Sequence, residues 1–256
     1  MRIALALVLA ALLPGAARAA AGAVDWQRKV VTCTGSGAAN LRDAGGNPAV
    51  ARIGAEKAAR LDALRSCLEA LRGVAVTSGQ TAGDAMASDA AVRARVEGTV
   101  RGFRVVGKPR YYSDGGVEMD VEVPLEGALS DALLPAGAGA APAGKGPAPG
   151  TSLVVDARGQ KVVPALAPRV LDPAGREIYG PSMLGAPARA GGGAAYARDL
   201  ESARRDLGAR LGDRPLVVKA ARVEGADLVL SDADAAALAG KDLSFLSEGR
   251  VVVLVD

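Results

Sequence analysis

The stretch from Asn47 to Gly73 constrains the fold more than any other part of the chain. It reads NPAVARIGAEKAARLDALRSCLEALRG and predicts one long amphipathic helix. Asn47 is a good N-cap, Pro48 suits the first helical position, and Gly73 is typical of a left-handed helix stop. Six apolar residues at helical spacing predict one apolar stripe, which needs a sheet to cover it: Val50, Ile53, Leu61, Leu64, Leu68 and Leu71.

The residues before and just after this helix predict the first part of that sheet. Residues 27–34 have the alternation and β-branched content of a strand, and Gly35-Ser36-Gly37 is typical of a turn. Residues 73–95 form a looser insertion, in which we expect a short helix near 89–96.

Three further segments complete the sheet. Residues 101–108 predict a strand, and 114–116 predict a hairpin turn. From Val117 to Leu125 apolar and acidic residues alternate, which predicts a strand with one buried and one wet face. The domain over 26–127 is therefore expected to be a strand-helix-strand-strand antiparallel sheet with one packed helix.

A low-complexity stretch divides the chain. Residues 135–150 are almost entirely Ala, Gly and Pro, and we take 128–150 as a linker. Residues 151–256 then predict a second, mixed αβ domain, so the fold class is α+β with two small domains. Its expected elements are strands near 153–155, 169–171 and 177–179, a helix over 196–211, strands near 216–218 and 228–230, a short helix capped by Ser231, and a buried strand over 251–255.

The composition excludes several functions. The chain contains no histidine, so His-dependent catalytic triads and His-containing zinc sites cannot form. Aromatic residues are 3%, which disfavours base-stacking nucleic-acid surfaces, and 31 Lys and Arg are scattered among 28 Asp and Glu. We therefore expect a protein that is not an enzyme, with no catalytic, cofactor-binding or metal-binding residues and no nucleic-acid partner.

Residues 1–19 have the order of a secretory signal peptide. Arg2 precedes an apolar run that is too short to span a bilayer, and Ala17-Arg18-Ala19 is typical of a cleavage site. We expect a mature chain without a transmembrane span. The first cysteine is Cys33, far from the apolar run, so we expect no lipid anchor. The predicted location is periplasmic or outer-membrane associated.

Cys33 and Cys67 are the two cysteines of the chain. In an oxidising compartment they can pair, and the disulfide would tie the first strand to the long helix. The alternative is a pair of buried free thiols.

Four polar patterns invite functional readings, and each has a plainer alternative. Gly191 to Gly193 precede a predicted helix and can bind phosphate through backbone amides, but a P-loop Lys and Ser/Thr are missing, which favours a flexible loop. Asp156 to Gly159 can hold an anion through Arg158, or can form an internal ion pair in a turn. The other two patterns are acidic sets. Asp227, Asp232, Asp234 and Asp242 suggest calcium ligands, but their spacing does not fit a calcium loop and favours helix capping and solvation. Glu118, Asp120 and Glu122 suggest carboxylate catalysis, but they share the exposed face of one predicted strand, which favours solubilising charges.

Several short segments resemble a known family. They are Gly35 to Gly37, AARLDAL at 58–64, Leu68, Gly73-Val74, residues 100–103, and VEMDVEVPL at 117–125. Together they resemble the Lpp-twenty (twenty-kilodalton) lipoprotein family, which is similar to the amino-terminal domain of flagellar assembly protein T. Residues 164–180 resemble segments that follow this domain in relatives of the family. The resemblance implies a compact domain of bacterial envelope proteins, often lipidated, and carries over no catalytic residues.

Two functions follow as hypotheses. The first is a non-enzymatic, exported envelope protein that binds other envelope proteins as an accessory of an outer-membrane, flagellar or secretion assembly. The second is a periplasmic module that binds a small ligand or cell-wall fragment through the loops around Gly35 and Gly191. A homo-oligomer built by extension of a sheet edge is compatible with either.

Overall fold

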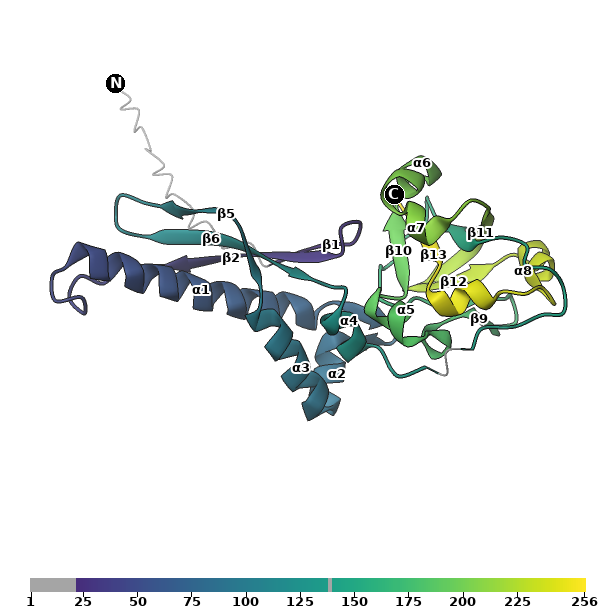
Figure 1. Cartoon of the computed structure of the whole chain (residues 1–256), viewed down its shortest axis with the longest axis horizontal. Helices are drawn as coiled ribbons and strands as arrows, with labels where there is room; N and C mark the ends of the chain where they lie inside the picture. The colour runs from purple at the N-terminus through teal and green to yellow at the C-terminus, as the bar shows by residue number, and fades with distance from the viewer. Residues whose placement is uncertain (1–21, 138–139) are drawn as a thin grey trace, which may run out of the picture.

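The computed structural model describes residues 22–137 and 140–256. They form two lobes that follow one another along the long axis of the molecule (Figure 1). The first lobe, residues 22–134, holds a four-stranded antiparallel sheet, and the second lobe, residues 140–256, holds a mixed seven-stranded sheet. The predicted α+β class is confirmed. The expected signal peptide lies outside the described residues.

The sheet of the first lobe has the strand order β1-β2-β6-β5, and a small β3-β4 hairpin lies apart from it. The elements of this lobe are β1 (Ala23–Asp25), β2 (Val30–Gly37), α1 (Pro48–Arg72), β3 (Ala75–Thr77), β4 (Gln80–Thr81), α2 (Ala82–Ser88), α3 (Ala90–Arg101), β5 (Arg104–Tyr111), β6 (Val117–Pro124) and α4 (Ala128–Leu133).

The sheet of the second lobe has the order β10-β13-β7-β11-β12-β8-β9. The elements of this lobe are β7 (Ser152–Asp156), β8 (Val170–Leu171), β9 (Glu177–Tyr179), the 3₁₀ turn η1 (Pro181–Met183), α5 (Ala186–Ala190), β10 (Ala194–Ala197), α6 (Leu200–Asp206), α7 (Gly208–Leu211), β11 (Pro215–Glu224), β12 (Asp227–Leu230), α8 (Asp232–Leu238), the 3₁₀ turn η2 (Ser244–Glu248) and β13 (Val251–Leu254).

Helix α1 begins and ends where the sequence predicts. The Asn47 side chain accepts hydrogen bonds from the amides of Ala49 and Val50, and Pro48 is the first helical residue. Gly73 ends the helix with φ −81°, not in the left-handed conformation that we expected. The long helix lies under the sheet along its whole length (Figure 1).

The face that α1 turns to the sheet differs from the predicted one. The buried residues recur every fourth position and are mostly small: Ala51, Ala55, Ala59, Ala63, Cys67 and Leu71. Val50, Ile53 and Leu61 are 50%, 53% and 67% exposed. Apart from Leu71, which belongs to both sets, the predicted apolar stripe is therefore not the face that packs on the sheet.

Two glycines of β2 explain why α1 turns its alanine face, and not the predicted stripe, toward the sheet. A Cβ atom on Gly35 would lie 2.1 Å from the carbonyl oxygen of Ala59, and one on Gly37 would lie 2.1 Å from that of Ala55. The strand and helix backbones thus approach so closely that only glycine fits on one side and alanine on the other. Residues 35–37, predicted as a turn, are part of β2, because this close packing continues to Gly37.

A disulfide joins the same two elements. Cys33 of β2 and Cys67 of α1 are bonded, with their Cα atoms 5.6 Å apart. Both cysteines lie in the buried contact between strand and helix. A crosslink between residues 34 positions apart is worth about 3–4 kcal/mol through the lost entropy of the unfolded chain.

Other predicted boundaries also change. The range 128–150 begins with helix α4, whose Leu129 and Leu133 are buried. Tyr196, expected in a helix, lies in β10, because that strand pairs with the buried strand β13. The helical part of 196–211 starts at Leu200, where Asp199 forms a capping box with Ser202.

We predict opposite effects for two Gly→Ala substitutions beside α1. Gly35→Ala should lower the free energy of unfolding by about 3 kcal/mol, because the new methyl group meets helix backbone. Gly54→Ala, in open space on α1, should raise it by about 0.5–1 kcal/mol. Urea denaturation of both variants checks the pair, and equal small effects would contradict the close approach.

Candidate functional site

The acidic residues of β6 form ion pairs on the outer face of the first sheet. Arg110 bonds both Glu118 and Asp120, and Glu122 is paired with Arg28 and Arg104. The hydrogen bond from Arg110 lowers the pKa of Asp120, and that from Arg104 lowers the pKa of Glu122. Asp120 and Glu122 are therefore held ionised as structural partners, which is unsuited to proton transfer at neutral pH.

The acidic residues of the second lobe do not converge. Asp227 pairs with Arg169, and Asp234 accepts the hydroxyl of Ser231 at the start of α8. The Asp242 carboxylate accepts the amide of Ser244. Arg158 binds Asp156 within its own turn, with Nη2 2.6 Å from Oδ2. Among the described residues, no cluster of acidic or cysteine side chains has the arrangement of a metal site.

The glycine loop at 191–193 lies where the two lobes meet, and cationic side chains fill its surroundings. Lys29 Nζ donates to the carbonyl of Gly191 at 2.7 Å and to Glu126 at 2.9 Å. Arg210 donates to the carbonyls of Gly191 and Gly193. The loop offers carbonyls to protein cations, so the structure gives no support to an amide cradle for phosphate.

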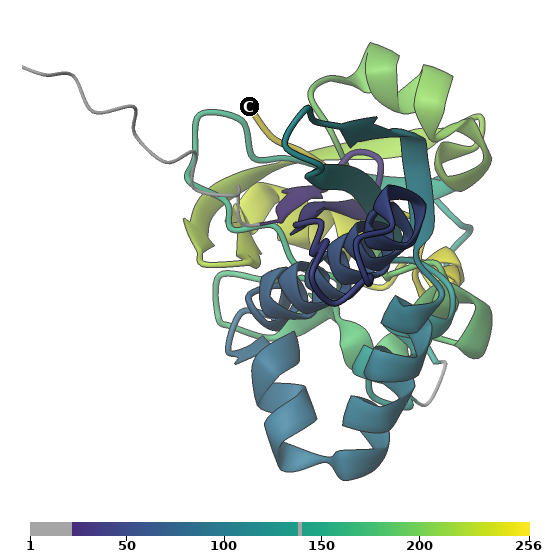
Figure 2. The same ribbon diagram turned by 90° about the vertical axis from the view of Figure 1, so that its left-hand side faces the viewer.

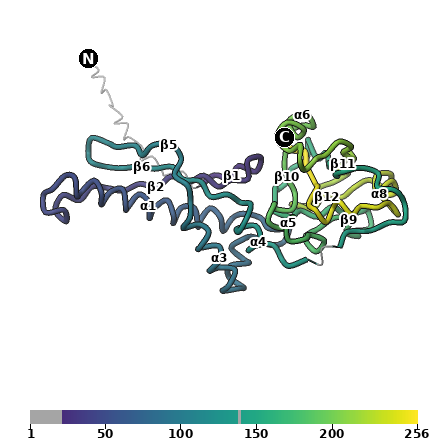
Figure 3. The backbone as a smooth tube through the Cα atoms, viewed as in Figure 1, coloured from purple at the N-terminus to yellow at the C-terminus, as the bar shows by residue number. Residues whose placement is uncertain are grey.

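Further contacts bind the lobes into one body. The rings of Trp26 and Tyr196 meet edge to face at 5.6 Å. The amides of Leu166 and Ala167 donate to carbonyls of β3, at Ala75 and Val76. One apolar core runs through both lobes. The backbone path in Figure 3 shows the first lobe leading into the second.

The buried lysine at this junction is electrostatically costly. Lys29 is 6% exposed, and burial, followed by repulsion from Arg210, lowers its pKa from 10.5 to about 8. Glu126 opposes the shift. Below pH 8 the folded protein therefore holds a charge that the unfolded chain accommodates more easily.

We predict that Lys29 contributes a rise in the free energy of unfolding between pH 8 and pH 10.5, measured as the difference between the native protein and Lys29→Met. In this window the unfolded chain binds the proton more strongly than the folded protein, so raising the pH favours folding, by about 3 kcal/mol in total. Urea unfolding of Lys29→Met should lack this rise. Lys161→Met, at an exposed position, is the matched control and should retain it. Parallel pH profiles for the native protein and Lys29→Met would contradict the assignment.

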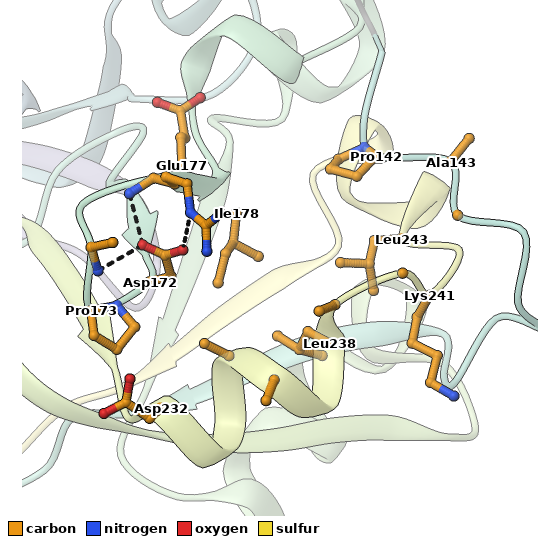
Figure 4. Close-up of a pocket in the computed structure, with 17 residues that line it drawn as sticks. Pro142, Ala143, Asp172, Pro173, Glu177, Ile178, Asp232, Leu238, Lys241 and Leu243 are labelled. Carbon is orange, nitrogen blue, oxygen red and sulfur yellow. Dashed lines mark hydrogen bonds and ion pairs between the residues drawn. The ribbon is translucent and has the colours of Figure 1, made fainter.

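A groove of about 710 Å³ opens on the second lobe, between the β8-β9 hairpin, α8 and the chain near Pro142 (Figure 4). Its wall is mostly apolar, with Ile178 facing Leu238 and Leu243. Its size is within the range of small-molecule sites. The linker residues Pro142 and Ala143 are held here, since Leu243 donates its amide to the Pro142 carbonyl.

The charges of this groove stand at its ends. The Asp172 carboxylate is occupied by Arg176 and by turn amides, and Glu177 accepts the hydroxyl of Ser182. Lys241 lies at the other end, as Figure 4 shows, and makes no ion pair with the described residues. Asp232, at the start of α8, also lines the groove and makes no ion pair with the described residues. The groove thus combines an apolar body with a cation, Lys241, and a carboxylate, Asp232, that are both outside ion pairs.

A second surface lies at the far end of the first lobe. A cavity of about 720 Å³ separates the start of α1 from the β5-β6 turn, and exposed Leu41, Ile53, Tyr111 and Tyr112 line it. Tyr111 donates its hydroxyl to Glu56, and the Arg52 guanidinium stacks over the same ring at 4.6 Å. Val50 and Leu61 extend the apolar surface along α1.

Neither surface was predicted from the sequence. Leu41 lies in a polar, glycine-rich loop, which hides it in the sequence. The adjacent Tyr111 and Tyr112, directly before the predicted hairpin turn, are a weak sequence signal for an exposed aromatic surface. Gly35, proposed as part of a ligand site, is buried against α1 with no room beside it. In the described ranges 22–137 and 140–256, no helix has the length and apolar character needed to cross a bilayer.

The comparison with known protein families concerns the second lobe. Residues 152–256 match the family described as the second domain of Treponema pallidum Tp0624. The matched segment begins with β7 and contains the whole seven-stranded sheet. No curated protein matches the chain. The second lobe is thus similar to that domain, and the disulfide in the first lobe indicates an extracytoplasmic protein.

Proposed function

We propose that this protein is a non-enzymatic accessory of an outer-membrane, flagellar or secretion assembly, which it joins by binding envelope proteins. The observation that carries the proposal is the apolar surface at the far end of the first lobe. Contiguous exposed aliphatic and tyrosine side chains are typical of protein-protein contact sites. The resemblance of residues 26–127 to the Lpp-twenty family supports the same kind of role.

The shape of the molecule also supports an accessory role. The apolar surface lies at the end of the long first lobe that is remote from the second lobe (Figure 1). A partner can bind at this surface without contacting the second lobe, which remains free for other interactions. The proposed location is the periplasm or the periplasmic side of the outer membrane.

We predict that crosslinking in intact cells, followed by fractionation, captures one stoichiometric set of envelope proteins. The double variant Leu41→Asp/Tyr112→Asp should lose this capture, because charges then replace apolar contact area. Val163→Asp, at an exposed position of the second lobe, is the control and should retain it. Recovery of an uncrosslinked periplasmic protein would contradict the proposal.

A second candidate function is ligand binding in the groove of Figure 4. The pairing of an apolar wall with Lys241 favours an amphiphile that has an apolar chain and one anionic group. In this alternative the protein is a periplasmic ligand-binding module.

This alternative predicts a thermal shift with a medium-chain fatty acid and a smaller one with the matching alcohol. Ala236→Trp should abolish the shift by filling the groove, because Ala236 is exposed and lines it. Ala237→Trp, one position further and outside the lining, is the matched control. An unchanged melting temperature with fatty acids, wall fragments and nucleotides would exclude the alternative.

A further inference from the structure

The predicted apolar stripe of α1 exists, but only half of it is covered. The sheet packs on the alanine face, so the stripe points to the opposite side of the helix. Helices α2 and α3 lie on that side under the C-terminal half of α1, as Figures 1 and 2 show. Leu64 and Leu68 pack partly against the core there, whereas Val50, Ile53 and Leu61 are exposed.

The covered half indicates what fits on the bare half. Within the chain, this face of α1 is covered by helices, and the cover ends at Phe103, directly after α3, where Arg60 stacks on the ring at 5.5 Å. The bare segment from Val50 to Leu61 is about 17 Å long at the rise of an α-helix. A helix of three turns or more therefore continues the packing that α2 and α3 begin.

The charges around the bare segment select the partner. Within the described residues, Arg52, Lys57 and Arg60 make no ion pair. Glu56, the carboxylate among them, already accepts the hydroxyl of Tyr111. The surface is apolar, with Lys57 within it and Arg52 and Arg60 beside it, so a complementary partner carries acidic side chains next to its apolar residues.

The same charges disfavour a second copy of this chain. Lys57 lies between Ile53 and Leu61 at spacings of four residues, in the middle of the stripe. An antiparallel pair of α1 helices centred on this segment would place Lys57 against its own copy. Such a pair brings like charges into an apolar contact without compensation.

We propose that the bare half of the α1 stripe binds an amphipathic helix of another protein, with apolar residues at positions i, i+3 or i+4, and i+7 and with Asp or Glu flanking them. The inference rests on the proposed function and names the chemistry of its partner. Val50, Ile53 and Leu61 contact the apolar side chains, and Arg52, Lys57 and Arg60 pair with the acidic ones.

The test uses two stapled synthetic helices of about 18 residues that share one Leu/Ile face. One carries Glu beside the apolar face and the other carries Lys at the same positions. Fluorescence anisotropy with the full mature protein should show the acidic helix binding at least about tenfold more tightly than the basic one. The charge reversal Lys57→Glu/Arg60→Glu should invert this preference.

Two further variants separate the stripe from other surfaces. Ile53→Asp/Leu61→Asp should abolish binding of the acidic helix, and Val217→Asp should leave it unchanged, since Val217 is exposed to the same extent as Ile53. All three side chains to be charged are exposed, and circular dichroism verifies that the variants fold. Equal binding of both helices, or full binding by Ile53→Asp/Leu61→Asp, would overturn the inference.

Three other results are informative. A dimer seen by sedimentation that Ile53→Asp/Leu61→Asp dissolves would overturn the choice of partner in favour of a second copy. Capture of envelope proteins in cells that survives Ile53→Asp/Leu61→Asp would leave the proposed function intact and remove this inference. Absence of any captured protein would instead remove the proposed function, whatever the synthetic helices do.

Discussion

The contact between β2 and α1 determines how the rest of the first lobe is built. Gly35 and Gly37 present bare backbone to Ala55 and Ala59, so strand and helix approach more closely than any larger side chain allows. The Cys33–Cys67 disulfide continues this contact toward the C-terminal end of the helix. Because the alanine face is committed to the sheet, the rotation of α1 about its own axis is fixed, and its larger aliphatic residues must point elsewhere.

That constraint gives α1 two apolar faces with different roles. The alanine face supplies close packing, and the aliphatic face supplies area for α2, α3 and, at its bare half, for the partner helix that we propose. Burying Val50, Ile53 and Leu61 is worth roughly 5 kcal/mol before the cost of association is subtracted. Apolar contact alone therefore gives weak binding, and the cations beside it must add both affinity and selectivity. This division suits an accessory protein that joins and leaves an assembly.

The sequence allowed prediction of those features that are encoded locally. The Asn47 cap, the hairpin turn at Asp114, the helix start at Ser231 and the buried strand β13 depend on neighbouring residues, and each is present. The rotation of α1 was predicted wrongly because hydrophobic periodicity ranks Leu, Ile and Val above Ala. The rotation of α1 is decided by Gly35 and Gly37, which lie in a different element, β2. In the sequence alone, without the helix that packs on them, two glycines this close together are typical of a turn.

The sites were harder to predict because they depend on residues far apart in the chain. Lys29 meets Gly191 across the two lobes, and the groove of the second lobe joins residues of the expected linker to α8. No local pattern encodes either meeting. The buried lysine, the Trp26–Tyr196 contact and the pairing of β3 with residues 166–167 hold the lobes together. Because the core is continuous through this junction, the distal surface and the groove belong to one packed body. The partner that we propose at the distal surface would therefore be placed relative to a ligand bound in the groove.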